Sequence, residues 1–98
     1  MNQFMIEIDL PTTFSEEYME LIPKQREKVI QLMSKKILVN FTLSANRDKI
    51  WTIVNAETEI EVMGILGTFP LYAYMVFNIH KIALHENVQL FLPQISLN

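Results

Sequence analysis

Few side chains in this chain of 98 residues could do chemistry, and one candidate is a carboxylate in the N-terminal strand pattern. Residues 2–10 alternate, and Glu7 falls on the side opposite Phe4, Ile6 and Ile8. If that side is enclosed, burial raises the pKa of a carboxyl group, and Glu7 could then act as a base. The other interpretation of Glu7 is a structural ion pair.

The two histidines, His80 and His85, lie five residues apart near the end of another strand pattern. Odd spacing on a strand places two side chains on opposite faces, and no third ligand stands near them, so we predict no metal site. The chain has no cysteine, which excludes disulfides and thiol chemistry. It also has no Gly-rich phosphate loop and no Ser-His-Asp set, so we predict no cofactor and no nucleophilic triad.

Composition sets the class of protein. Half of the residues are hydrophobic (50%) and only 19% are charged, while the net charge is −3. A nucleic-acid-binding surface is normally basic, so we predict no nucleic-acid partner. No apolar run reaches the roughly 20 residues of a membrane helix, and the first ten residues are not typical of a signal peptide. We therefore predict a soluble, cytoplasmic domain with no membrane partner.

The N-terminal half predicts a strand over residues 2–10 and then a long helix. The segment Thr13-Phe14-Ser15-Glu16 fits a capping box, and it opens a helix over residues 14–35. Pro23 removes one backbone hydrogen bond, so we expect a kink or break near Ile22. The expected buried stripe of this helix is Met19, Ile22, Arg26, Val29 or Ile30, and Met33.

The C-terminal half predicts a hairpin, a second helix and a last strand. Residues 37–44 and 49–55 are strand-like, and the short turn at 45–48 makes them antiparallel neighbours. Thr58-Glu59-Ile60-Glu61 is a second capping box, opening a helix that ends near Leu66, and residues 72–83 form the fourth strand. In strand 37–44 simple alternation places four side chains on one face, namely Ile37, Val39, Phe41 and Leu43.

The predicted order β-α-β-β-α-β indicates an α+β, ferredoxin-like fold with an antiparallel sheet, over residues 1–86. Two helices cover only one face of such a sheet, yet the strands carry bulky side chains on both faces. We therefore expect two sheets to pack face to face in a homodimer, a dimeric α+β barrel. The apolar tail, residues 87–98, is predicted to contain a strand that packs on the partner subunit.

Two segments carry a family resemblance. Phe69-Pro70-Leu71-Tyr72-Ala73-Tyr74-Met75 is followed, ten residues later, by His85, and the first helix contains Lys24-Gln25-Arg26-Glu27-Lys28. These segments resemble the Leu-Pro-Leu-Phe-Pro-Tyr-Met, Leu-Ala-Arg-His and Lys-Ala-Arg-Glu-Lys stretches of the muconolactone isomerase family. The resemblance covers Lys24 to His85, and it implies a ferredoxin-like dimeric barrel that can assemble into a larger ring of dimers.

The resemblance also implies site residues. Arg26 would clamp a ligand carboxylate, Glu27 would carry a proton alongside the candidate Glu7, and Tyr74 would form a hydrogen-bonding wall. Adjacent helical residues point about 100° apart, so Arg26 and Glu27 cannot both face one ligand squarely. His85 matches the terminal histidine of the family, and a surface or interface role is its alternative.

Strand 37–44 departs from the family. The family carries Trp, Arg and His near the positions of Leu38, Val39 and Asn40, and another Trp and Arg near Thr42 and Leu43. Asn40 is therefore the substrate-binding candidate where the family has an imidazole. Because fold carries over more safely than activity, these losses leave more than one function open.

The sequence thus predicts a protein that binds a small organic ligand and shifts a double bond in a lactone or related carboxylate by proton transfer. The alternative is a non-catalytic dimeric barrel that binds a ligand or only assembles, which the missing His and Arg would favour. A cofactor-free monooxygenase is a third reading, resting on fold analogy alone.

Overall fold

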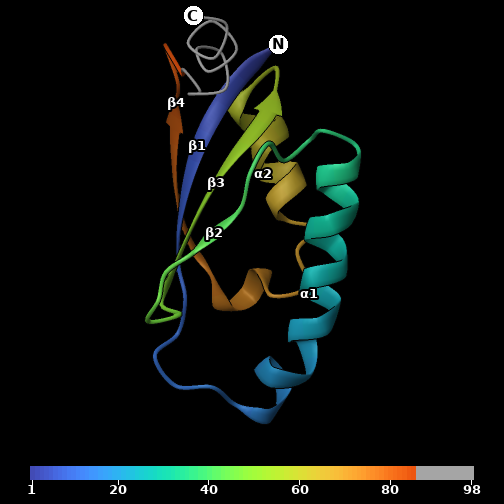
Figure 1. The fold of residues 1–98 in the computed structure, drawn as a ribbon, viewed down its shortest axis with the longest axis vertical. Helices are drawn as coiled ribbons and strands as arrows, with labels where there is room; N and C mark the ends of the chain where they lie inside the picture. The colour runs from blue at the N-terminus through green and yellow to red at the C-terminus, as the bar shows by residue number, and fades with distance from the viewer. Residues whose placement is uncertain (86–98) are drawn as a thin grey trace, which may run out of the picture.

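A computed structural model describes residues 1–85 and contains one four-stranded antiparallel sheet (Figure 1). The central strand β1 (Asn2–Asp9) lies between β3 (Lys49–Ala56) and β4 (Val76–Lys81), and the short β2 (Thr42–Leu43) pairs with the far side of β3. The strand order is therefore β2-β3-β1-β4. The predicted tail strand at 87–98 lies outside the described residues.

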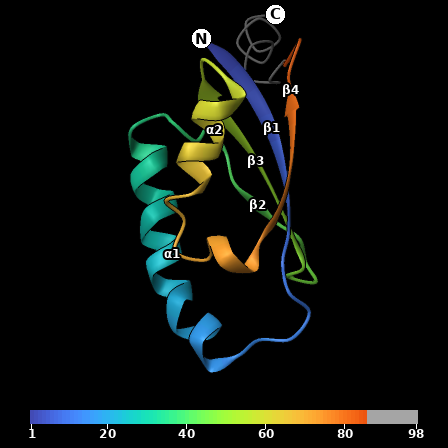
Figure 2. The same cartoon turned by 180° about the vertical axis from the view of Figure 1, so that it is seen from behind.

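Both helices lie on the same side of the sheet, as the two opposite views show (Figures 1 and 2). Helix α1 (Glu16–Ser34) connects β1 to β2, and α2 (Glu59–Leu66), followed by the short 3₁₀ helix η1 (Tyr72–Tyr74), connects β3 to β4. This order and strand arrangement confirm the ferredoxin-like α+β fold that the alternation and capping patterns predict.

The core lies between the sheet and the helices, because one face of each strand is apolar. In β1 the alternation is as predicted: Phe4, Ile6 and Ile8 are buried beneath the helices, whereas Gln3, Met5, Glu7 and Asp9 lie on the other face. The other large apolar side chains of the core come from both helices, β3, and the segments before β2 and before β4: Tyr18, Val29, Leu32, Leu38, Ile50, Val54, Val62, Leu66, Phe69, Leu71 and Met75.

Helix α1 begins two residues later than predicted. Its N-cap is Ser15, whose hydroxyl accepts a hydrogen bond of 3.1 Å from the Tyr18 amide, so the predicted Thr13–Glu16 capping box is wrong. Starting at this point places Tyr18 in the core, where it stacks on Phe14 with the ring centroids 5.1 Å apart. The second predicted cap is confirmed, since Thr58 accepts from the Glu61 amide at the start of α2.

The predicted buried stripe of α1 is right at Val29, and Ile22 packs partly buried against the core, but the prediction is wrong at its other positions. The buried residues are Tyr18, Gln25, Val29 and Leu32, while Met19, Arg26, Ile30 and Met33 are exposed. Apolar residues occur around much of this helix, so periodicity alone is compatible with two different buried sides. The side that is buried leaves the Arg26 guanidinium in water and places the Gln25 amide in the core. Burying an unpaired charge costs far more than burying a hydrogen-bonded amide. Pro23 lies within one continuous helix, so the predicted break near Ile22 does not occur.

Strand 37–44 is irregular rather than continuous. Leu38 forms an isolated bridge with Val54, and regular pairing resumes only where Thr42 faces Trp51. From one pair to the next, the chain advances four residues on this strand (Leu38 to Thr42) but three residues on β3 (Val54 to Trp51). The one extra residue is the mark of a β-bulge. The bulge breaks the predicted alternation. Leu38 pairs with Val54 and Leu43 pairs with Ile50, and both of these β3 partners are buried beneath the helices. Leu38 and Leu43 therefore lie on the same face of the sheet, although simple alternation assigned them to opposite faces.

The last strand is shorter than predicted. Residues 72–74 form η1 instead of a strand, with the Tyr74 amide donating to the Leu71 carbonyl and the Met75 amide to that of Tyr72. Pro70 favours this local folding because it lacks an N–H group for a strand ladder. From residue 76 onward β4 alternates, with Phe77 and Ile79 toward the core and Val76, Asn78 and His80 away from it.

Candidate functional site

The face of the sheet turned away from the helices carries most of the polar side chains that meet one another. We call this surface the open face, and it is formed by Gln3, Met5, Glu7 and Asp9 of β1, Lys49, Trp51, Ile53 and Asn55 of β3, and Val76, Asn78 and His80 of β4. It mixes apolar and polar groups, because Trp51 and Val76 are exposed on it while the Gln3 amide donates to Asn55 over 3.0 Å.

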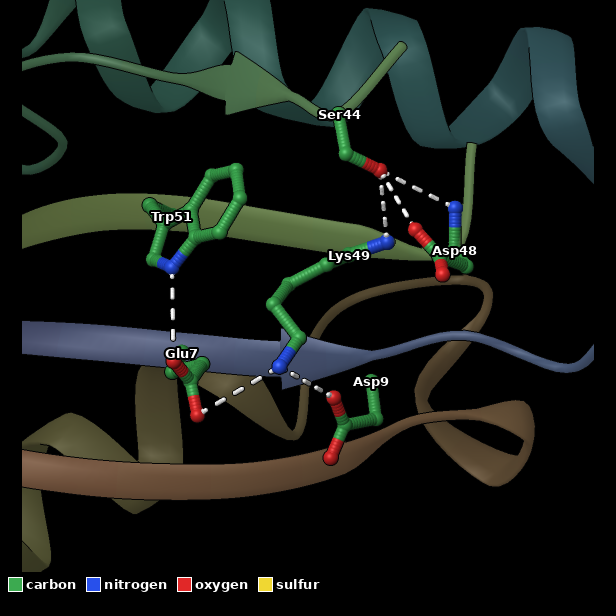
Figure 3. A network of polar contacts seen from close by, with 6 residues as sticks. All are labelled: Glu7, Asp9, Ser44, Asp48, Lys49 and Trp51. Atoms are coloured by element: carbon green, nitrogen blue, oxygen red, sulfur yellow. Dashed lines mark hydrogen bonds and ion pairs between the residues drawn. The ribbon is translucent and has the colours of Figure 1, made fainter. Parts of the chain in front are cut away.

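Glu7 lies at the centre of a polar cluster on the open face (Figure 3). Its two carboxylate oxygens have different partners: Oε1 lies 3.8 Å from Lys49 Nζ, and Oε2 accepts a hydrogen bond of 3.4 Å from Trp51 Nε1. The same Lys49 Nζ lies 3.3 Å from Asp9 Oδ1. The sheet register creates this cluster, because Glu7 faces Trp51 and Asp9 faces Lys49 across the β1–β3 ladder.

Lys49 is the only cation in this cluster of described residues, and two carboxylates share it. The hydrogen bond to Asp9, the charge of Asp9 and the charge of Glu7 together raise the pKa of Lys49 above its ordinary value. An ammonium group has three N–H donors, and the hydrogen bond to Asp9 uses one of them, whereas Glu7 Oε1 at 3.8 Å forms an ion pair only. Lys49 therefore remains charged at neutral pH and keeps a donor for a ligand oxygen.

The hairpin turn between β2 and β3 fixes the backbone of Lys49. Ser44 Oγ accepts from the backbone amides of Asp48 (3.1 Å) and Lys49 (3.0 Å), and donates to Asp48 Oδ1 over 2.7 Å (Figure 3). This serine therefore closes the 45–48 turn that the sequence predicted, and it sets the direction in which β3 starts. Because Lys49 is the first residue of β3, this turn also fixes the position from which its side chain extends.

Asn40, predicted as a substrate-binding residue, lies in the bulge next to β3. Its side-chain Oδ1 accepts from the Ile53 amide over 2.9 Å, and its backbone carbonyl accepts from the Thr52 hydroxyl over 2.6 Å. The adjoining Val39 amide donates to the Ile53 carbonyl. The side chain of Asn40 thus replaces the backbone carbonyl that the bulge removes from the ladder.

The remaining predicted site residues lie away from Glu7. Arg26 and Glu27 are exposed on α1, and His85 is exposed beyond the end of β4. Tyr74 lies in η1 on the helix side of the sheet, where its ring meets that of Tyr18 edge to face with the centroids 5.2 Å apart. The structure therefore places Glu7 and Tyr74 on opposite sides of the sheet, and it joins none of the other candidates to Glu7.

Three residues of interest escaped the sequence reasoning. Lys49 and Trp51 could have been found from the register of β1 against β3, since residues directly opposite on one face come into contact. Gln25 is buried on the inner side of α1, and it carried no signal because glutamine is normally a surface residue.

Other parts of the described chain offer less chemistry. A shallow depression at the start of α1 is lined by Phe14, Glu16, Met19 and Glu20, none of which is a predicted site residue. Within residues 1–85, no group of three His, Cys, Asp or Glu side chains is placed to hold a metal ion. Over the same range, neither helix has the length and apolar character needed to cross a membrane.

The fold and the open-face cluster together define a ferredoxin-like α+β protein with an ion pair on the side of its sheet turned away from the helices. The sequence model of the muconolactone delta-isomerase family matches residues 3–88, and the chain belongs to that family. This match confirms the predicted resemblance and extends it to β1, which the two motif segments did not reach. No individual curated protein matches the chain.

Proposed function

We propose that this protein shifts a double bond in a small lactone that carries a carboxylate, by moving one proton between two carbon atoms. Membership of the muconolactone delta-isomerase family over residues 3–88 is the observation that carries the proposal, since it supports isomerase-like function in general. The reaction needs a base beside a carbon acid, a donor or cation for negative charge, and a site from which water is largely excluded.

Glu7 is the group that best fits the proton carrier. Two donors hold its carboxylate in place, whereas Glu27 is exposed on α1 and no described contact orients it. In the proposed reaction the Glu7 carboxylate takes a proton from one ring-system carbon, the electron pair moves into the conjugated system, and the protonated Glu7 returns the proton to the more distant carbon. The carboxylate is thereby regenerated, and no other reactant is consumed.

Lys49 is the proposed binding group for the negative charge of the ligand. Its remaining N–H donor can reach an oxygen of the lactone or of its carboxylate, and its charge stabilises the enolate-like intermediate. Trp51 contributes a flat indole surface next to the same carboxylate. Arg26, the clamp implied by the family motif, is exposed on α1, which lies on the other side of the sheet from Lys49 (Figures 1 and 2).

Enclosure is the remaining requirement, because the side chain of Glu7 is 37% exposed and that of Lys49 is 34% exposed. We propose that the open face of a second copy covers this surface in a homodimer, which gives the two-sheet barrel expected from the sequence. The exposed apolar groups of the face support this, among them Trp51 and Val76. Withdrawal of water from a carboxylate makes it a stronger base, so the same contact would activate Glu7.

The test is turnover of muconolactone by the purified protein, followed by its ultraviolet absorbance. Replacing Glu7 by Gln removes the proton carrier but keeps the shape, and we expect turnover to fall by about 10²- to 10⁴-fold. The matched control is Glu27→Gln, which neutralises an exposed carboxylate on α1 and should leave the rate within about twofold. Absence of turnover above buffer in the wild-type protein rejects the proposed reaction, and equal losses in the two variants reject the role of Glu7.

The proposed dimer has its own measurement. Light scattering at micromolar concentration should give a mass near twice 11.5 kDa, or a larger even multiple if dimers form a ring. A mass of one chain would contradict the enclosure that the reaction requires, whatever the outcome of the turnover assay.

A further inference from the structure

The outer side of α1 carries apolar side chains that the core does not use. In both views α1 forms the outer edge of the molecule, with the sheet on the opposite side (Figures 1 and 2). Met19, Ile30 and Met33 are exposed, at 52%, 61% and 39% of their surfaces, and Ile22 is only partly buried. Single exposed apolar residues are ordinary on protein surfaces, but several in one row indicate an interaction surface.

These residues form one row with Arg26, and the row has the same order in both directions. We call it the α1 stripe, and its members, at successive steps of three, four, four and three residues, are Met19, Ile22, Arg26, Ile30 and Met33. Steps of three and four residues keep side chains on one side of a helix. The stripe contains most of the residues that periodicity predicted to be buried, so within residues 1–85 this periodicity is left largely without a partner.

A palindromic row is complementary to a second copy of itself. When two α1 helices lie antiparallel with their Arg26 residues facing, Met19 of each copy meets Met33 of the other, and Ile22 meets Ile30. Every apolar position of the stripe in one copy then faces an apolar position in the other. A two-fold contact between identical surfaces requires this self-complementarity.

The charges at the two ends of α1 favour the antiparallel direction. The first turns carry the exposed carboxylates Glu16, Glu17 and Glu20, whereas the exposed Lys35 and Lys36 follow the last residue of the helix. An antiparallel pair brings each acidic end beside the basic end of the other copy, and it also opposes the two helix dipoles. A parallel pair would place carboxylates beside carboxylates and ammonium groups beside ammonium groups.

The centre of the stripe is charged, and the pair neutralises it. Two guanidinium groups approach each other at the two-fold axis, but Glu27 is exposed next to Arg26 on the same helix. An antiparallel pair brings the same flank of both helices together, so the Glu27 of each copy lies beside the Arg26 of the other. Two carboxylates thus balance two guanidinium groups, and the methylene stem of Arg26 packs against the neighbouring isoleucines.

We propose that two copies of this chain pair through the α1 stripe, antiparallel about a two-fold axis at Arg26. The stripe lies on the helix side of the sheet, whereas the enclosure proposed for Glu7 uses the open face. The two contacts can therefore form at the same time, and the α1 contact does not depend on the isomerase reaction. From residue 19 to residue 33 the stripe spans about 21 Å of helix, which is short for a stable interface, so the pairing should be reversible and increase with concentration.

Cross-linking tests the geometry directly, because the chain has no cysteine of its own. Under mild oxidation Arg26→Cys should form a disulfide-linked dimer, since the two-fold axis places this residue beside its own copy. Met19→Cys and Met33→Cys should each stay uncross-linked alone, whereas an equimolar mixture of the two should cross-link. The matched control is Glu17→Cys, which is exposed on the same helix about 180° from Arg26 and should not cross-link.

Two outcomes of this experiment overturn the proposal. If Arg26→Cys cross-links no more than Glu17→Cys, the helices do not meet at the stripe. If Met19→Cys alone cross-links as strongly as its mixture with Met33→Cys, the helices are not antiparallel.

Sedimentation velocity over a range of concentrations tests the apolar part of the contact. Ile30 enters the contact twice, once from each copy, so Ile30→Asp should raise the concentration at which the larger species appears by about 10- to 100-fold. The matched control Ile60→Asp introduces the same charge at an exposed isoleucine of α2 and should leave association unchanged. Both positions are exposed, so both variants should keep the fold, which circular dichroism checks. Equal effects of the two variants, or no effect of Ile30→Asp, also overturn the proposal.

Discussion

Asn40 offers the sharpest test of how this fold separates structural polar groups from functional ones. The bulge between Leu38 and Thr42 removes one backbone acceptor from the β2–β3 ladder, and Asn40 Oδ1 supplies the replacement for the Ile53 amide over 2.9 Å. Ile53 has no exposed surface, so water cannot take over this bond. Replacing Asn40 by Ala should therefore leave a buried N–H group without a partner.

The expected loss follows from that single orphaned donor. A buried polar group without a partner costs about 1–3 kcal/mol, so Asn40→Ala should lower the free energy of unfolding by about 2 kcal/mol. In a domain of this size, each kcal/mol lowers Tm by roughly 4–8 °C. The change should therefore lower Tm by about 8–16 °C. Asn40→Asp keeps an acceptor oxygen in the same place and should lose less than half as much stability.

Urea denaturation of the wild type and the two variants measures this difference. A second variant, Thr52→Val, removes the hydroxyl that donates to the Asn40 carbonyl and should cost about 0.5–1.5 kcal/mol. If Asn40→Ala loses less than about 0.5 kcal/mol while ligand binding weakens, the structural assignment is refuted and Asn40 is a ligand-binding residue. Equal losses in the Ala and Asp variants would also contradict the reasoning, because the acceptor oxygen would then be irrelevant.

The other predictions concern Lys49 and Pro23. Asp9→Asn removes one of the two carboxylates on Lys49, so it should lower KM for an anionic lactone by about two- to fivefold, and a raised KM would contradict this. Because the pKa of Lys49 is raised on folding, its stabilising effect is complete below the ordinary value of 10.5 and is lost as pH rises through the higher folded-state pKa. The stability difference between the wild type and Lys49→Met should thus narrow above about pH 10.5 in urea titrations, and a constant difference up to pH 12 would refute it. Pro23→Ala restores an N–H donor inside α1 and should raise the free energy of unfolding by about 1–3 kcal/mol, whereas a loss would show that Pro23 is required.

The fold could be predicted from sequence because its main signals are local. Alternation in residues 2–10 set both faces of β1 correctly, and the Thr58 cap set the start of α2. The phase of α1 could not be set in the same way, because Met19, Ile30 and Met33 compete with Tyr18, Val29 and Leu32 for the buried side. That choice depends on the cost of burying Arg26, which involves the whole core and not the helix alone.

The bulge before β2 shows a second limit of predicting structure from sequence patterns. A single extra residue between Leu38 and Thr42 reverses the alternation, and nothing in a local hydrophobic pattern marks it. The partners of Glu7 could not be predicted from a local pattern either. Lys49 and Trp51 belong to β3, and they reach Glu7 only through the register of β3 against β1. Sequence reasoning therefore identified the carboxylate but not its partners, because pairs distant in the chain depend on register.

Charge constrains how two open faces can meet in the proposed homodimer. The Glu7–Asp9–Lys49 cluster carries two negative charges and one positive charge, a net charge of −1 in each copy. Sheets that pack face to face lie about 10 Å apart, and two unit charges at that distance repel by about 1–2 kcal/mol at an effective dielectric constant near 20. An arrangement that stacks the clusters directly is therefore disfavoured. An offset that moves Lys49 toward Asp9 of the partner subunit replaces this repulsion by attraction.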